Sequence, residues 1–267
     1  MKPFQKIMFR WTIATLILFG GVHPAVAAMQ SKTIDYQFGN KTFKGYLAWD
    51  DSFPGKRPGI LVVHEFWGLN DYAKSRADQL AKLGYVAFAA DMFGDGKVAS
   101  HPDDAKSMAK EATANLADWV GRAQAGLDTL RRQPKVDPNK LAAIGYCFGG
   151  ATALQLAFSG SDIKLAASFH GSLPVPESAA KVRGEILVFH GGSDAFISAE
   201  TIQNFRAKLD AAKVNYRFIV YPGAVHGFSV PEADKRGMAN VAYHAEADQK
   251  SWQELLSALR RIFPQPN

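Results

Sequence analysis

Gly-Tyr-Cys-Phe-Gly-Gly at residues 145–150 decides the fold of this 267-residue chain. It follows an apolar run of strand type at residues 141–146 and precedes a helical pattern at residues 151–158. Small residues around a nucleophile, at a sharp turn from a strand into a helix, have the form of the Gly-x-Ser-x-Gly elbow, with Cys147 in the serine position. The stretch therefore predicts an α/β fold with a reactive side chain at the end of a central strand.

Strand and helix patterns alternate on both sides of this elbow. Residues 33–38 and 42–49 form a predicted hairpin around Gly39-Asn40, a hairpin turn signal. Predicted buried strands follow at residues 60–63, 85–90, 141–146, 163–169, 185–189 and 216–221. Predicted helices lie at residues 71–83, 102–132, 151–158, 198–212 and, for the most part, 234–262, and Asp137-Pro138-Asn139 ends the longest of them. This order predicts one doubly wound domain over residues 29–267, with a mostly parallel sheet and its crevice at the carboxyl ends of the strands.

The first 28 residues have the three parts of a secretory signal. Three basic residues precede an apolar run at residues 11–22, and the small residues 25–27 offer a cleavage site. We expect cleavage after Ala27, with Ala28 as the near alternative and an uncleaved anchor as the competing interpretation. The mature protein would be exported, to the periplasm or beyond, without stable insertion in a membrane.

Charge argues against a nucleic-acid partner once this signal is set aside. Its removal deletes three basic residues and no acidic ones, so the formal charge falls from +6 to +3. No run of five or six basic residues remains. The single cysteine, Cys147, has no partner for an internal disulfide, so it is either buried and inert or a reactive thiol.

A nucleophilic thiol needs a base and a group that orients the base, and in this class of fold the order is nucleophile, acid, histidine. Asp194 follows the strand at residues 185–189, and His226 follows the strand at residues 216–221. We therefore predict His226 as general base and acid, and Asp194 as its orienting carboxylate. The competing interpretations are a helix cap for Asp194 and a surface turn for His226. Asp91 is the second candidate for the acid, although it precedes the nucleophile.

The elbow also predicts which groups would stabilise negative charge at the site. Cys147 would lie at a helix N-terminus, where the dipole favours a thiolate, and the N–H of Phe148 would be an oxyanion donor. His64, His170 and His190 all end strands, but no metal-type spacing accompanies them. We expect these three to line the pocket or bond backbone, and we expect no metal and no organic cofactor.

Four motifs together resemble the dienelactone hydrolase (carboxymethylenebutenolidase) family. They are His-Glu-Phe-Trp-Gly-Leu-Asn at residues 64–70, the elbow, His-Gly-Gly-Ser-Asp at 190–194, and Tyr-Pro-Gly-Ala-Val-His-Gly-Phe at 221–228. The resemblance runs from about residue 33 to residue 263 and implies the α/β-hydrolase fold. The family's triad is similar to Cys147, Asp194 and His226.

The resemblance implies two further roles. Glu65 matches the family's glutamate that partners the resting thiol and moves when substrate arrives, and Phe66 matches the second oxyanion donor. The family's dienelactone enzymes hold the substrate carboxylate with two arginines, and neither place offers one in this chain, although Lys97 or Arg236 could substitute. Aromatic side chains at Trp67, Phe93 and Phe228, with those of Phe66 and Phe148, suggest an apolar pocket.

The sequence therefore predicts a monomeric hydrolase that cleaves a small ester or (di)enol-lactone through the Cys147 thiol. The alternative is a non-catalytic or redox-sensing binding protein of the same fold. The absence of the expected arginines leaves the physiological substrate open.

Overall fold

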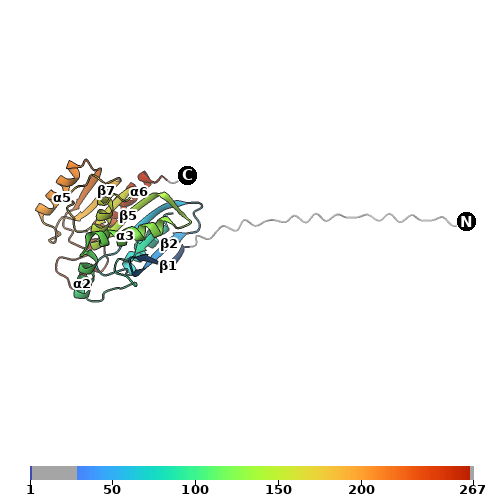
Figure 1. Ribbon diagram of the computed structural model, residues 1–267, viewed down its shortest axis with the longest axis horizontal. Helices are drawn as coiled ribbons and strands as arrows, with labels where there is room; N and C mark the ends of the chain where they lie inside the picture. Colours follow the sequence, from blue (N-terminus) through green and yellow to red (C-terminus); the bar gives the residue numbers. More distant parts are fainter. Residues whose placement is uncertain (2–28, 265–267) are drawn as a thin grey trace.

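The structure, a computed structural model, describes Met1 and residues 29–264 (Figure 1). The predicted signal, apart from Met1, lies outside these residues, so it stays a prediction. Eight strands form one sheet in the order β1-β2-β4-β3-β5-β6-β7-β8. Their bounds are β1 Met29–Phe38, β2 Lys41–Asp50, β3 Arg57–Val63, β4 Val86–Ala90, β5 Val136–Tyr146, β6 Leu165–Phe169, β7 Glu185–Gly191 and β8 Tyr216–Tyr221.

The sheet is antiparallel at one edge and parallel through its centre. β1 pairs with β2, and β2 with β4, in antiparallel fashion, whereas β4, β3, β5, β6, β7 and β8 pair in parallel. All seven residues of β3 are buried, as expected for a strand covered on both faces. The predicted doubly wound, mostly parallel α/β-hydrolase fold is confirmed.

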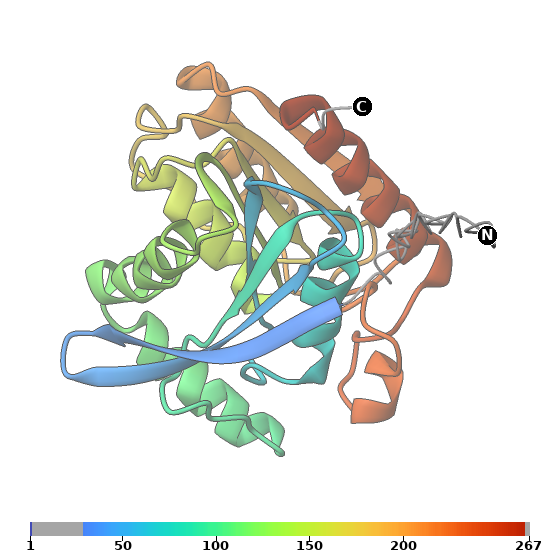
Figure 2. The ribbon, with the colours of Figure 1, turned by 90° about the vertical axis from the view of Figure 1, so that its right-hand side faces the viewer.

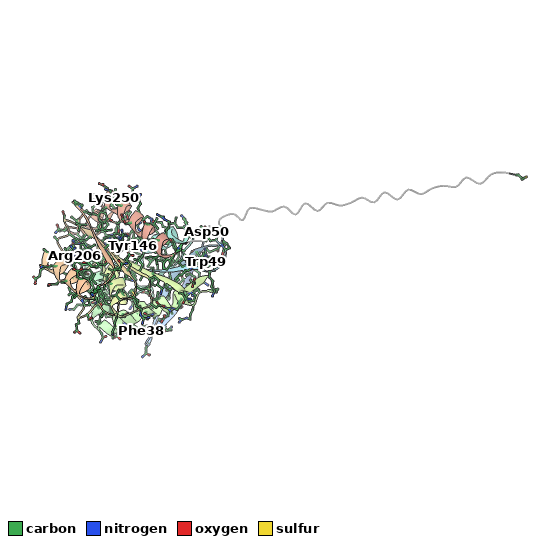
Figure 3. The ribbon with its side chains drawn as sticks, turned by 90° about the horizontal axis from the view of Figure 1, so that it is seen from above. Phe38, Trp49, Asp50, Tyr146, Arg206 and Lys250 are labelled. Atoms are coloured by element: carbon green, nitrogen blue, oxygen red, sulfur yellow. The ribbon has the colours of Figure 1, made fainter. Side chains whose placement is uncertain are left out.

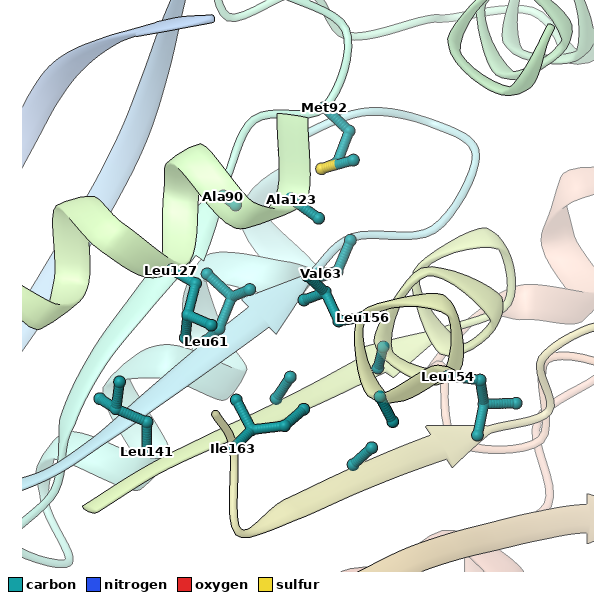
Figure 4. Packing of buried hydrophobic residues seen from close by; sticks show 14 of the residues in the cluster. Leu61, Val63, Ala90, Met92, Ala123, Leu127, Leu141, Leu154, Leu156 and Ile163 are labelled. Atoms are coloured by element: carbon teal, nitrogen blue, oxygen red, sulfur yellow. The ribbon is translucent and has the colours of Figure 1, made fainter. Parts of the chain in front are cut away.

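Helices cover both faces of this sheet. They are α1 Asp71–Ala81, α2 Pro102–Thr113, α3 Leu116–Arg131, α4 Phe148–Phe158, α5 Ala199–Ala211 and α6 Ala245–Ile262. One core cluster packs Leu127 of α3 and Leu154 of α4 on β3, and a second packs α1 and α6 on the opposite face. Figure 2 shows α6, in red, across the sheet from the green α3. Figure 4 shows Leu61 of β3 beneath Leu127 and Val63 further along the same strand, and Figure 3 places Tyr146, at the end of β5, in the interior.

Three predicted boundaries were wrong, each for a local reason. The helix predicted at residues 102–132 is two helices, because the Asn115 side chain accepts a hydrogen bond from the N–H of Asp118 and begins α3 anew. The strand predicted from residue 141 begins at Val136, so Asp137-Pro138-Asn139 lies inside β5, where the register shifts opposite Pro58 and Gly59. The helix predicted from residue 234 begins only at Ala245. Residues before it form the short 3₁₀ helix Ala233–Arg236 and left-handed turns at Gly237 and Asn240.

The parallel strands end at a common edge, and loops at this edge carry the predicted site residues. Glu65 follows β3, Cys147 follows β5, Asp194 follows β7 and His226 follows β8.

Within the described part of the chain, no helix has the length and apolar character needed to cross a bilayer.

Candidate active site

Cys147 occupies a strained turn between β5 and α4. Its φ of 52° and ψ of −116° lie outside the regions that side chains ordinarily adopt. Such strain persists only where the surrounding structure imposes it, and it is typical of functional sites. The residue precedes the first turn of α4, whose unpaired N–H groups and dipole favour negative charge on the sulfur.

Small residues around Cys147 are required by close backbone contacts. A Cβ at Gly145 would lie 2.0 Å from the carbonyl oxygen of Gly149, and one at Gly149 would lie 2.2 Å from that of Val63. At Gly150 a Cβ would approach the hydroxyl of Ser168 to 2.5 Å. The elbow therefore needs glycine at each of these positions, as its sequence pattern predicts.

His226 lies between Cys147 and Asp194. Its Nδ1 is 2.9 Å from Oδ2 of Asp194, and the ring also hydrogen-bonds the Cys147 side chain. The Asp194 carboxylate accepts a second bond, from the N–H of Phe196 at 2.9 Å, which fixes its orientation. The structure thus brings together the three side chains that their order in the sequence suggested.

The charges of this trio reinforce one another. Burial opposes protonation of His226, but the interactions of its ring with Cys147 and with the Asp194 carboxylate outweigh burial and raise the pKa of His226 to about 10. Burial also opposes ionisation of Asp194, yet the hydrogen bond and charge of His226 hold its pKa below the ordinary value of 3.8. The arrangement therefore favours the imidazolium form of His226.

His64 fixes the loop that carries Glu65 and Phe66. The N–H of Met92 donates to Nε2 of His64 at 3.1 Å, so the ring proton is on Nδ1 and is donated to the carbonyl oxygen of Glu65. The ring is fully buried, and burial lowers the pKa of His64. A neutral histidine thus holds the backbone next to the N–H of Phe66, and the expectation that this residue bonds backbone is confirmed.

Glu65 pairs with Arg236. An Arg236 nitrogen lies 3.1 Å from Oε2 of Glu65, and the guanidinium also stacks over the ring of Trp67 at 4.9 Å. Burial raises the pKa of Glu65, and the charges of Arg236 and His226 offset part of this rise. The resemblance implied a contact between Glu65 and the resting thiol, whereas the recorded partner of this carboxylate in the described chain is Arg236.

A cavity of about 440 Å³ opens in front of Cys147. Of the predicted residues, it is lined by Glu65, Phe66, Trp67, Cys147, Phe148 and His226. Its other walls come from α2, α3, the start of α4 and the loops after β6, β7 and β8: Ala109, Thr113, Trp119, Ala151, Ser172, Phe196, Ala233, Arg236, Met238 and Val241.

Two aromatic residues predicted in the pocket lie behind it. Phe93 is 5% exposed and packs against His64 and Phe148, and Phe228 is fully buried against His170 and Tyr221. Neither lines the cavity, so this part of the prediction was wrong. Both follow strands, and the backbone after those strands turns these rings into the core.

The sequence interpretation missed Trp119 as a cavity residue. Its indole N–H donates to the hydroxyl of Thr152 at 2.8 Å, which in turn donates to the carbonyl oxygen of Phe148 at 2.9 Å. The ring also stacks on Phe148. Its helical spacing looked like that of an ordinary core residue, and only the packing of α3 beside α4 reveals its position at the site.

Other candidate residues have structural partners. The Asp91 carboxylate is fully buried and accepts N–H bonds from Lys44, Phe93, Gly94 and Gly96, so it organises the loop after β4. Within residues 29–264, no three of the His, Cys, Asp and Glu side chains are grouped as metal ligands. The prediction that no metal is needed stays a prediction.

Known proteins resemble this chain in sequence along most of its length. The model of the dienelactone hydrolase family matches residues 43–263. This chain belongs to the dienelactone hydrolase family. A Yersinia pestis protein provisionally named carboxymethylenebutenolidase is 32% identical over 230 residues, which cover 79% of this chain and 80% of the relative. The family therefore identifies the protein as a hydrolase of esters or lactones.

Solved structures of the family agree with this fold. A dienelactone hydrolase-like promiscuous phosphotriesterase from metagenomic libraries is 38% identical, with a TM-score of 0.86 over 88% of this chain and 99% of its own. A provisionally assigned dienelactone hydrolase of Klebsiella pneumoniae is 24% identical, with a TM-score of 0.74 over 88% of this chain and 99% of its own. The second likeness supports the fold alone.

Proposed function

We propose that this dienelactone hydrolase-family enzyme cleaves its ester or lactone through a Cys147–His226–Asp194 triad. The observation that carries the proposal is the chain of contacts from the thiol through His226 to Asp194, at the mouth of a cavity. The thiolate attacks the carbonyl carbon, and the carbonyl π electrons move to its oxygen. The N–H groups of Phe148 and Phe66 stabilise this oxyanion.

Collapse of the tetrahedral intermediate expels the alcohol or enol oxygen, which takes a proton from the His226 imidazolium. An acyl thioester on Cys147 remains. Neutral His226 then removes a proton from water, which attacks the thioester, and the departing sulfur leaves as the thiolate beside the regenerated imidazolium. Asp194 orients His226 in both halves of the cycle.

The cavity lining combines apolar side chains with a guanidinium, which supports a substrate with an apolar body and an acidic group. Trp119, Phe148 and Ala151 offer an apolar wall, whereas Arg236 supplies a cation near Glu65. Lys97, the other suggested substitute for the family's arginines, is absent from the lining. We therefore infer that Arg236 takes the carboxylate of an enol-lactone or related ester.

The test is the intact mass of the protein after brief mixing with an activated short-chain ester, with Cys147→Ala as the matched control. A transient single acyl adduct on the wild type alone is expected. An equal rate of turnover in Cys147→Ala would overturn the triad. A freely alkylated thiol with neither adduct nor turnover would favour the binding or redox alternative.

The 38% identical phosphotriesterase supports a second candidate activity. The apolar wall can accept a neutral phosphotriester, and the same thiolate can displace its leaving alcohol. We propose slow cleavage of such triesters, with a phosphorylated Cys147 as intermediate. Incubation with a chromogenic phosphotriester should release its phenolate and label Cys147 alone; release that is undiminished in Cys147→Ala would contradict this.

The first 28 residues support a further proposal, that the enzyme acts outside the cytoplasm. Amino-terminal sequencing of the protein recovered from a periplasmic fraction tests it. A sequence that begins at Ala28 or Met29 is expected, and a chain that retains Lys2 would contradict export.

A further inference from the structure

A buried hydrogen-bonded network lies directly behind His226 and plays no part in the chemistry just described. His170 follows β6, and its Nε2 lies 2.9 Å from the hydroxyl oxygen of Ser229. Ser229 belongs to the loop that carries His226. Both His170 and Ser229 are fully buried, so this pair is not open to substrate.

The network continues from Ser229 into α1 and α6. The Tyr72 hydroxyl oxygen is 2.8 Å from the hydroxyl of Ser229 and 3.1 Å from its carbonyl oxygen. Arg76 donates to Tyr72 at 3.3 Å and to the Ser229 carbonyl at 2.9 Å. Its guanidinium also pairs with Asp248 of α6. α1 thus bonds Ser229, three positions after His226, directly, and α6 is joined to Ser229 through Arg76.

The donors and acceptors of this network link Arg76 to His170. Arg76 can only donate, so the Tyr72 oxygen accepts from it, and the Tyr72 proton can go to the hydroxyl or the carbonyl oxygen of Ser229. The Ser229 hydroxyl bonds both Tyr72 and Nε2 of His170, and either direction of donation satisfies all three groups. The other ring nitrogen, Nδ1, is buried and has no partner among the described residues. Ser229 is therefore the side chain that holds the His170 ring by a hydrogen bond.

Full burial favours the neutral form of His170, and this form suits its neighbour. The His170 ring lies edge-on to the His226 ring, with centroids 5.3 Å apart and an interplanar angle of 68°. Burial and the charge of His226 both lower the pKa of His170. A neutral ring can support the imidazolium of His226 sterically, where a second cation would oppose it.

Backbone strain at His170 indicates that this contact is imposed by its surroundings. Its φ is 39°, in the region that favours glycine, and its N–H donates to the carbonyl oxygen of Phe189 at 2.9 Å. Among residues that follow the parallel strands, Cys147 shares this feature. The strained backbone places one ring behind the other.

We propose that His170 and Ser229, held by Tyr72 and Arg76, are positioning residues that fix the His226 ring toward the Cys147 thiol. The proposal rests on the proposed triad, because a ring can only be positioned for thiol chemistry if His226 serves the thiol. Loss of the network leaves His226 in place on its loop but free to turn, so catalysis falls more than substrate binding.

The experiment compares His170→Leu and Ser229→Ala with His170→Gln, whose amide can replace the ring nitrogen as the hydrogen-bond partner of Ser229. Activity toward a chromogenic ester, the melting temperature and the rate of Cys147 alkylation by iodoacetamide at neutral pH are measured for each. Tyr85→Phe, at a buried tyrosine outside the network, is the matched control for Tyr72→Phe.

We expect kcat to fall about 10-fold in His170→Leu and Ser229→Ala with KM within about twofold, and thiol alkylation to slow in parallel. His170→Gln should recover most of both rates, and Tyr72→Phe should be slower than Tyr85→Phe. Lower melting temperatures with unchanged kcat and alkylation, or no difference between His170→Gln and His170→Leu, would overturn the proposal. Failure of the triad itself gives a different result, because Cys147→Ala would then retain turnover whatever the alkylation rates show.

Discussion

Cys147 and Lys213 have the same φ of 52°. Cys147 lies at the carboxyl edge of the sheet, where the parallel strands end, and Lys213 lies at the amino edge, where they begin. Lys213 follows α5, where its N–H bonds Asp210 and the next N–H bonds Leu209, an ordinary left-handed helix end. Cys147 precedes a helix, and its ψ of −116° excludes that explanation. The same φ therefore reflects helix termination at one edge and an imposed, functional turn at the other.

The two edges also hold cavities of similar size. The amino-edge cavity, about 410 Å³, includes Lys164, Arg183, Lys213 and Arg261 in its lining. Glu185 there is paired with Arg261 and Arg217, and Lys164 with Asp162. The cavity at the carboxyl edge is the one in front of Cys147, and it instead brings together a thiol, an imidazole and strained backbone. Size does not distinguish the two; convergent reactive groups do.

The largest contrast between the edges is expected from Cys147→Ala set beside Arg183→Ala. The first should abolish turnover and change the free energy of unfolding by no more than about 1 kcal/mol, since it removes only a sulfur at a partly exposed position. The second should leave kcat/KM within about twofold. Steady-state kinetics and urea unfolding measure both, and a loss of activity in Arg183→Ala alone would reverse the assignment of the edges.

Asp194→Asn should reduce kcat by about 10²- to 10⁴-fold, because His226 loses the anion that orients it. It should also change acid stability. The folded-state pKa of Asp194 is lowered, so its ionisation stabilises the protein above pH 3.8 and this contribution is lost as the pH falls through the folded-state value. Urea unfolding across this range should show the loss in the wild type and not in Asp194→Asn.

Arg236→Ala should separate charge recognition from catalysis. For an ester that bears a carboxylate, KM should rise about 10- to 100-fold, the effect of one lost charge-assisted hydrogen bond. For a neutral ester of the same size, kcat/KM should stay within about threefold. An equal loss of kcat/KM for both esters would show that Arg236 acts by positioning Glu65 rather than by binding the substrate carboxylate.

The smallest expected effect tests the strain comparison. Lys213→Gly should raise the free energy of unfolding by about 1 kcal/mol, because glycine accepts the left-handed conformation without penalty. Activity should not change. A destabilised Lys213→Gly protein would mean that the lysine side chain contributes more at the amino edge than its geometry suggests.

The sequence predicted those features that depend on local patterns. Strand burial and turn sterics act within a few residues. The sequence alone could therefore predict the buried strands, the elbow glycines and the order of Cys147, Asp194 and His226. The α2–α3 break was missed because Ala114-Asn115 contains neither Gly nor Pro and the apolar spacing continues through it. Only the capping hydrogen bond of Asn115 reveals the break.

Residues that reach the cavity through long-range packing were harder to predict. Arg236 arrives beside Glu65 because left-handed residues at Glu232 and Gly237 bracket a 3₁₀ turn, a conformation that no motif signals. Phe93 and Phe228 were misassigned because the end of a strand specifies the edge of the sheet but not the direction in which the next ring points. His170 and Ser229 carry no motif, and their roles depend on partners from α1.

The Arg76–Asp248 ion pair has a consequence for the timing of synthesis. Arg76 lies in α1, and its carboxylate partner is translated only when the ribosome reaches α6. Until then the Asp248 carboxylate that pairs with this guanidinium is missing, and α6 is not there to cover its face of the sheet. We expect nascent chains that stop short of α6 to have no esterase activity. Activity should arise only once translation has passed α6.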